Sequence, residues 1–116
     1  MIFFYILVPE GPPETIEYEV LNSTAISFTL SPPERTVVNG IITQYTVYYK
    51  TIEDIETSQT FLSNEDGQNT TVVVAGLRKF FDHEIHITAH TRIGEGPRSP
   101  MLTIKTHEDG NYLLYR

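Results

Sequence analysis

Residues 42–51 read ITQYTVYYKT, and this stretch decides the kind of fold that the sequence predicts. Its side chains alternate, so that Tyr45, Val47 and Tyr49 share one face while Thr46 and Tyr48 share the other. A period of two residues is typical of a β-strand, and aromatic and β-branched side chains favour a pleated surface. We therefore predict a strand here, with the face of Tyr45, Val47 and Tyr49 turned toward a core.

The same period recurs on both sides of this stretch, in short runs separated by Pro, Gly, Asn and Asp. No run longer than a turn has the three- and four-residue spacing of an amphipathic helix. Around the strand expected at 59–62, we expect acidic charge to discourage unwanted pairing at a sheet edge. The pattern predicts an all-β domain with further strands at residues 16–20, 26–30, 59–62, 71–74, 83–90 and 101–105.

The composition describes one globular domain. The chain has 116 residues, of which 40% are hydrophobic and 20% charged. A formal net charge of −7 would repel a polyanion, so we expect no nucleic-acid partner. The absence of cysteine excludes disulfides and thiolate chemistry. We expect no cofactor, and a monomer in isolation.

The apolar opening MIFFYILV is far shorter than the roughly 20 residues of a spanning helix, so we expect no direct membrane insertion by this domain. It also lacks the basic start and cleavage site of a signal peptide. We favour a hydrophobic remnant of a longer chain over an extra strand. The prolines of PEGPPET then predict the start of the domain. We expect an N-terminal extension over 1–8, the domain over 9–107 and a C-terminal linker or tail over 108–116.

Several motifs together resemble the fibronectin type III family over about residues 9–107. They are GPPE, SFTLSPPE, NGIITQYTVYY, AGL, and the hairpin TRIGEGPRSP followed by LTIKT. The resemblance implies a seven-stranded antiparallel β-sandwich of the immunoglobulin-like kind. It is greatest to repeats in the ectodomains of receptor-type tyrosine phosphatases and similar many-repeat receptors.

The sequence departs from the family pattern at two positions. Members usually carry Trp where this chain has Leu30, and a Tyr where it has His83. We expect a smaller centre between the sheets, filled by Phe28, Phe80 or Phe81. We also expect the His83 imidazole to donate the hydrogen bond of the missing phenol, and to resist protonation because it is shielded from water.

Two N-x-[ST] sequons, Asn22-Ser23-Thr24 and Asn69-Thr70-Thr71, are candidate glycosylation sites. Both are predicted at strand ends, where an acceptor amide can be exposed. Such triplets also occur by chance in proteins that never meet the secretory pathway. The family resemblance favours glycosylation of Asn22 and Asn69.

Three histidines lie close together in sequence, but their spacing argues against a shared metal site. The odd spacing of His83 and His86 puts them on opposite faces of a strand, and His86 and His90 lie ~13 Å apart at 3.3 Å per residue. His86 and His90 share the expected outer sheet face with Thr46 and Tyr48. We interpret these four residues as a candidate partner face, with an ordinary solvated face as the simpler alternative.

Catalysis is not predicted. The chain has no Cys, no Gly-rich phosphate loop before a helix, and no G-x-S-x-G or H-E-x-x-H motif. We interpret Glu53-Asp54 and Glu65-Asp66 as solvated charge on loops.

The resemblance instead implies a non-catalytic binding or spacer module in the extracellular part of a plasma-membrane protein. Its partners would be neighbouring repeats in the same chain and an unidentified protein. Two alternatives stay open: an intracellular structural repeat of the muscle-scaffold type, and a spacer module of a bacterial carbohydrate-active enzyme.

Overall fold

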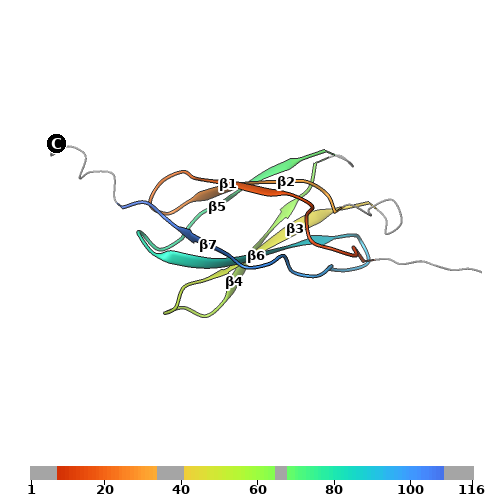
Figure 1. Cartoon of the computed structure of the whole chain (residues 1–116). Coiled ribbons are helices and arrows are strands. Elements are labelled where there is room, and N and C mark those ends of the chain that lie inside the picture. The colour runs from red at the N-terminus through yellow and green to blue at the C-terminus, as the bar shows by residue number, and fades with distance from the viewer. Residues whose placement is uncertain (1–7, 34–40, 65–67, 109–116) are drawn as a thin grey trace, which may run out of the picture.

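The computed structural model of this protein describes residues 8–33, 41–64 and 68–108, which form seven β-strands and no helix. The strands are β1 (Ile16–Val20), β2 (Ile26–Leu30), β3 (Gln44–Lys50), β4 (Thr57–Leu62), β5 (Thr70–Val74), β6 (Asp82–His90) and β7 (Leu102–Lys105). They make two antiparallel sheets, in the orders β1-β2-β5 and β4-β3-β6-β7, which form the two layers seen in Figure 1. The predicted seven-stranded sandwich is confirmed.

The core lies between the two sheets and follows the alternation of the sequence. In β2, Ile26, Phe28 and Leu30 are buried while Ser27 and Thr29 are partly exposed. Each such side chain contributes about 1.5–3 kcal/mol when it leaves water. The buried apolar cluster consists of Ile26, Phe28, Leu30, Ile42, Tyr45, Val47, Val72, Val74, Leu77, Ile85, Ile87, Ala89 and Ile104.

Of the three phenylalanines that we expected as alternatives for the centre between the sheets, Phe28 is the one that lies there. Phe28 has no exposed surface and packs beside Leu30 in the core. The other two alternatives do not fill the centre, because Phe80 is 49% exposed and Phe81 is only partly buried. Phe80 lies in the turn before β6 with a φ of 52°, a left-handed conformation that is unusual for a bulky residue. The ammonium of Lys105 lies 4.5 Å from the centroid of the Phe80 ring.

Two polar side chains are buried in the core region without hydrogen-bond partners among the described residues. The Tyr45 hydroxyl has none, and burial raises the pKa of Tyr45 to about 12. The ring of His83 is 1% exposed, and neither of its nitrogens makes a hydrogen bond of normal geometry. The ring does face backbone groups of Phe81 and Ile104, but none of these contacts has the geometry of the hydrogen bond that we expected His83 to donate.

Strand β4 differs from its prediction in length. It begins at Thr57, two residues earlier than expected, and its sequence TSQTFL contains no charged residue. The acidic residues Glu53, Asp54 and Glu56 precede the strand instead of lying on it. The acidic loop beside this edge strand is as expected, and its effect on edge pairing stays a prediction.

Some expectations lie outside the described residues: those for the opening segment up to Leu7, the Asn39-Gly40 turn, the Glu65-Asp66 pair and the tail from 109 onward. Within the described residues, no helix has the length and apolar character to cross a membrane.

Candidate partner-binding face

The four residues of the candidate partner face come together on the outer surface of the β4-β3-β6-β7 sheet. Strand register places Tyr48 opposite His86, Thr46 opposite Thr88, and His90 opposite Gln44. Residues that are opposite in an antiparallel pair point to the same side of the sheet. The sequence therefore placed Thr46, Tyr48, His86 and His90 correctly on one face.

The segment between β6 and β7 folds back over one half of this face. Its residue Glu95 forms an isolated bridge to His90, and its carboxylate accepts a hydrogen bond from the Thr88 hydroxyl at 2.7 Å. The Tyr48 hydroxyl also donates to the same carboxylate oxygen. Beneath these contacts, Thr88 is 1% exposed and Thr46 is 4% exposed. Half of the candidate face is thus covered by the domain's own chain.

The histidines of this face are held by polar contacts rather than arranged around an ion. His90 Nε2 lies 2.8 Å from the Thr46 hydroxyl, which also bonds to Thr60 at 2.9 Å. His86 Nδ1 lies 2.9 Å from the backbone oxygen of Ser99, so this nitrogen donates to the carbonyl. Among the described residues, no cluster of three or more His, Cys, Asp or Glu could hold a metal ion.

Arg98 fastens the same segment to the loop before β4. Its guanidinium makes two hydrogen bonds of 2.8 Å to the Glu56 carboxylate and lies 4.0 Å from the centre of the Tyr48 ring. These bonds hold the pKa of Glu56 below its ordinary value. Burial would raise the pKa of Glu95, but the hydrogen bonds from Tyr48 and Thr88 outweigh it and lower that pKa. Burial, together with Glu95, raises the pKa of the Tyr48 hydroxyl.

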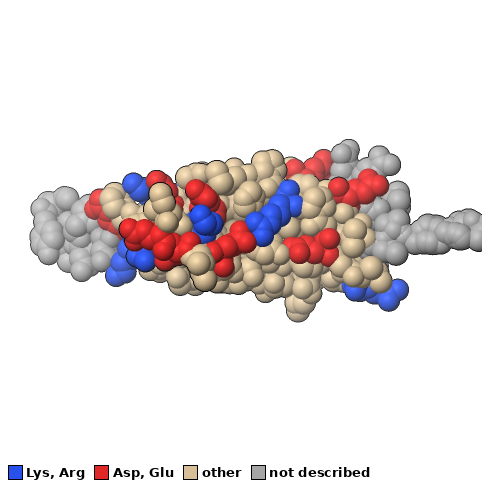
Figure 2. Space-filling view, turned by 90° about the horizontal axis from the view of Figure 1, so that it is seen from below, with Lys and Arg blue, Asp and Glu red and all other residues tan. Residues whose placement is uncertain are grey.

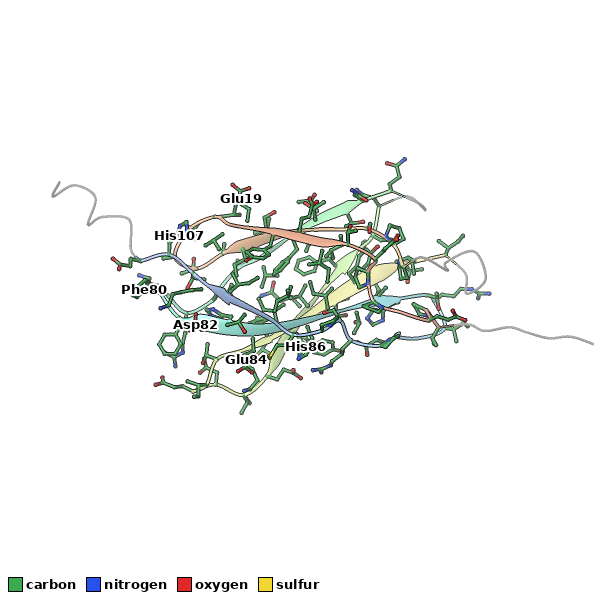
Figure 3. The ribbon with its side chains drawn as sticks, viewed as in Figure 1. Glu19, Phe80, Asp82, Glu84, His86 and His107 are labelled. Carbon is green, nitrogen blue, oxygen red and sulfur yellow. The ribbon has the colours of Figure 1, made fainter. Side chains whose placement is uncertain are left out.

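The other half of the sheet face is open. A groove of about 410 Å³ lies there, lined by Ile52, Phe80, Phe81, Asp82, Glu84, Thr103 and Lys105. Figure 3 shows Phe80 in the turn before β6, followed by Asp82, Glu84 and His86 along the strand toward the covered half. Figure 2 shows acidic and basic side chains interleaved on the lower side of the molecule, consistent with pairs such as Lys50–Glu84 at 3.6 Å. We call the groove lined by Ile52, Phe80 and Lys105 the open groove.

Sequence reasoning missed the open groove. Its apolar residues come from two turns, and a lone exposed Ile52 or Phe80 gives no signal in a sequence, since it resembles any core residue.

A second pocket, of about 340 Å³, lies between the β3–β4 loop and the β5–β6 loop. Arg78 closes it with bonds of 2.8 and 3.2 Å to the two carboxylate oxygens of Asp54. The Thr51 hydroxyl donates to the same carboxylate at 2.7 Å. The bonds from Arg78 and Thr51 lower the pKa of Asp54 to about 2. Asp54 is therefore part of a loop clamp and not a free acid or base at neutral pH.

Both candidate glycosylation sites are exposed. Asn22 lies in the β1–β2 turn, where its side-chain oxygen accepts a hydrogen bond of 2.9 Å from the Thr24 backbone. Asn69 directly precedes β5, and its backbone oxygen accepts a bond of 2.8 Å from the Asn64 side chain. A glycan on either asparagine would project into solvent without disturbing the core.

Comparison with known families gives a match over most of the chain. The model of the family described as "Fibronectin type III domain" matches residues 11–105. Protein sidekick-1 of Gallus gallus is 36% identical over 103 residues, which cover 88% of this chain and 5% of the relative. Cell adhesion molecule Dscam2 of Drosophila melanogaster is 32% identical over 103 residues, which cover 88% of this chain and 5% of Dscam2. Human receptor-type tyrosine-protein phosphatase F is 28% identical over 101 residues, which cover 87% of this chain and 5% of the phosphatase.

Solved structures agree with this match. The fn3 domain of human contactin 1 superposes with a TM-score of 0.72 at 21% identity, covering 96% of this chain and 89% of that one. The FN5 domain of Drosophila Lar superposes with a TM-score of 0.62 at 25% identity, covering 84% of this chain and 97% of the Lar chain. The chain therefore equals about one whole domain of these structures, but only 5% of the length of the curated relatives it matches.

Proposed function

This chain belongs to the fibronectin type III family, and on that basis we propose that it is a non-catalytic binding and spacer module in the extracellular part of a many-repeat cell-surface receptor. The observation that carries the proposal is the match to single segments of much longer proteins, among them one named a cell adhesion molecule and one named a receptor-type phosphatase. A segment that covers 5% of such a protein serves as one repeat among many domains.

The geometry supports a spacing and binding role. The hydroxyls of Thr46 and Thr88 do lie beside His90 and Glu95, but both threonines are buried, so a substrate could not reach them as an acyl- or phosphoryl-transfer site requires. If the parent is a receptor phosphatase, its catalysis belongs to a separate domain. Contacts with protein partners would use the open groove and the partly exposed Tyr48 and His86, because Thr46 and Thr88 are buried.

Extracellular placement can be tested by measuring whether Asn22 and Asn69 carry glycans after secretion. The chain would be secreted from an animal cell line behind a supplied signal peptide, and its intact mass measured before and after treatment with an N-glycosidase. We expect the N-glycosidase to remove two glycans from the wild-type chain. It should remove only one from Asn22→Gln and only one from Asn69→Gln. Poorly secreted protein without glycans would contradict the proposal and favour the intracellular scaffold repeat instead.

A further inference from the structure

The open groove holds large apolar side chains in contact with water. Ile52, Phe80 and Phe81 line it, and Ile52 and Phe80 are 88% and 49% exposed. Single apolar residues are normal on a surface, but several that line one groove are typical of a site where another segment binds. The open groove therefore has the apolar lining of a docking site.

The backbone of Phe80 points to binding independently of the groove. Its φ of 52° lies in the left-handed region, where the Cβ atom of any residue except glycine comes too close to the following carbonyl oxygen. Residues held in such costly conformations concentrate at binding sites and in switch regions. A bulky aromatic residue at this position indicates that the turn before β6 does more than connect two strands.

The chain leaves the described part of the molecule beside this groove. The backbone N–H of Phe80 donates a hydrogen bond of 3.2 Å to the carbonyl oxygen of His107, and residue 108 is the last one described. Figure 3 shows Phe80 and His107 at the same end of the sandwich. Residues 109–116 follow with the sequence DGNYLLYR, and we call them the C-terminal segment. At about 3.3 Å per residue this segment reaches up to roughly 26 Å, so it is long enough to lie along the groove.

The composition of the C-terminal segment fits the groove. Asp109, Gly110 and Asn111 are residue types that favour a turn, as a segment that reverses direction after β7 requires. The run Tyr112–Tyr115 then supplies four consecutive large side chains of apolar or aromatic character. Such side chains gain free energy when they leave water and pack against an apolar surface.

The charges favour this segment over a second copy of the domain. The chain carries a formal net charge of −7, so a second copy is repelled over most of its surface. In the C-terminal segment, by contrast, the charges of Asp109 and Arg116 cancel. The groove presents the carboxylates of Asp82 and Glu84 against the one ammonium of Lys105, so it also attracts the guanidinium of Arg116.

We propose that the C-terminal segment folds back and docks in the open groove of its own domain, with the run Tyr112–Tyr115 against Ile52 and Phe80. The segment is tethered at His107, beside the groove, so its effective concentration is in the millimolar range and a weak contact is enough to populate the docked state. A partner that uses the groove has to displace the segment. Only this consequence rests on the proposed function, whereas the docking is a property of the chain alone.

The test uses tryptophan fluorescence of the full chain, which has no tryptophan of its own. Tyr115→Trp and Tyr112→Trp each place a single reporter at one end of the apolar run. We expect the emission of both variants to lie at shorter wavelength than in the urea-unfolded chain, and to be quenched less by acrylamide, because the groove shields the indole from water. Neither property should change on dilution, since the contact lies within one chain.

Matched substitutions then identify the groove. Ile52→Ser and Phe80→Gly, each combined with a tryptophan reporter, should remove the shift to shorter wavelength. Phe80→Gly also relieves the unfavourable φ, so the domain should stay folded, as a thermal melt would verify. The control is Ile41→Ser, at an isoleucine that is 62% exposed but does not line the groove, and it should keep the shift.

Three results would overturn the inference. The first is emission from both reporters equal to that of the unfolded chain, and the second is an equal loss of the shift in Ile41→Ser and Ile52→Ser. The third is a shift that disappears on dilution, which would assign the contact to the C-terminal segment of a second copy. None of these results affects the glycan measurement that tests the extracellular function.

Discussion

Tyr48 and Glu95 lie 47 positions apart in the sequence, yet the Tyr48 hydroxyl donates a hydrogen bond to the Glu95 carboxylate on the outer face of the β4-β3-β6-β7 sheet. Thr88 donates to the same carboxylate at 2.7 Å. One acidic side chain thereby fixes the segment after β6 onto two strands, and this contact decides which part of the face a partner can reach.

Glu95→Ala should release that segment. Hydrogen bonds to a charged acceptor stabilise a fold by about 1.5–3 kcal/mol, and because Glu95 is partly exposed we expect a loss of about 1 kcal/mol in the free energy of unfolding. The Tyr48 pKa should fall toward its ordinary value. Urea unfolding and a pH titration of the tyrosine resonances measure these two changes. If the control Glu19→Ala, on exposed β1, costs as much stability, the bridging role of Glu95 is refuted.

His83 should make the stability of the domain depend on pH. Burial lowers the pKa of its imidazole, although backbone groups of Phe81 and Ile104 and the carboxylates of Asp54 and Asp82 partly offset the effect. The folded state therefore binds fewer protons than the unfolded state below about pH 6.5, so stability is lost as the pH falls from there toward the lowered folded-state pKa. Urea melts at about pH 7.5 and about pH 5 measure the loss, which His83→Tyr should reduce. An undiminished loss in the variant would show that another group is responsible.

Tyr45 and Tyr49 provide a matched pair of hydroxyl deletions. The Tyr45 hydroxyl is buried without a partner among the described residues, so Tyr45→Phe should leave stability unchanged or raise it by roughly 1 kcal/mol. The Tyr49 hydroxyl accepts a bond of 2.9 Å from Gln59, so Tyr49→Phe should lower stability by about 0.5–1.5 kcal/mol. Denaturant melts of the two variants measure both values. If Tyr45→Phe lowers stability more than Tyr49→Phe does, the Tyr45 hydroxyl must make a stabilising contact and this prediction is wrong.

Asp54 should stabilise the loop clamp at neutral pH and lose this role in acid. The hydrogen bonds from Arg78 and Thr51 lower its pKa from 3.8 to about 2, so the folded state favours the ionised form. The stabilisation is fully present above 3.8 and disappears as the pH falls from 3.8 toward about 2. Asp54→Asn should therefore decline less in thermal stability over this range than wild type does. The control Glu17→Gln should keep the wild-type decline, and an Asp54→Asn curve parallel to that of the control would count against the clamp.

Strands with one buried face were predictable because alternation is written directly in the sequence. The run Ile26, Phe28 and Leu30 predicted β2 at its observed bounds, and the alternation of residues 83–90 predicted most of β6. The outer-face position of Tyr48 and His86 follows from the same period, since parity along a strand fixes the face of the sheet.

Expectations that depended on loops fared less well. The exposure of Phe80 and the start of β4 at Thr57 could not be predicted, because turn geometry and the exact start of a strand carry no periodic signal. The covering of Thr46 and Thr88 was also missed, because it depends on where Glu95 folds back.

The sequence by itself determined the all-β class, the strands, the inward faces of β2, β3, β5 and β6, and the family, because local alternation and turn residues act over a few positions. The tertiary structure alone decided that Glu95 and Arg98 cover half of the partner face, that His83 is 1% exposed, and that the uncharged strands β4 and β5 share one side with Asn69. Those features join residues distant along the chain, and they are set by how two twisted sheets pack and by where each loop returns.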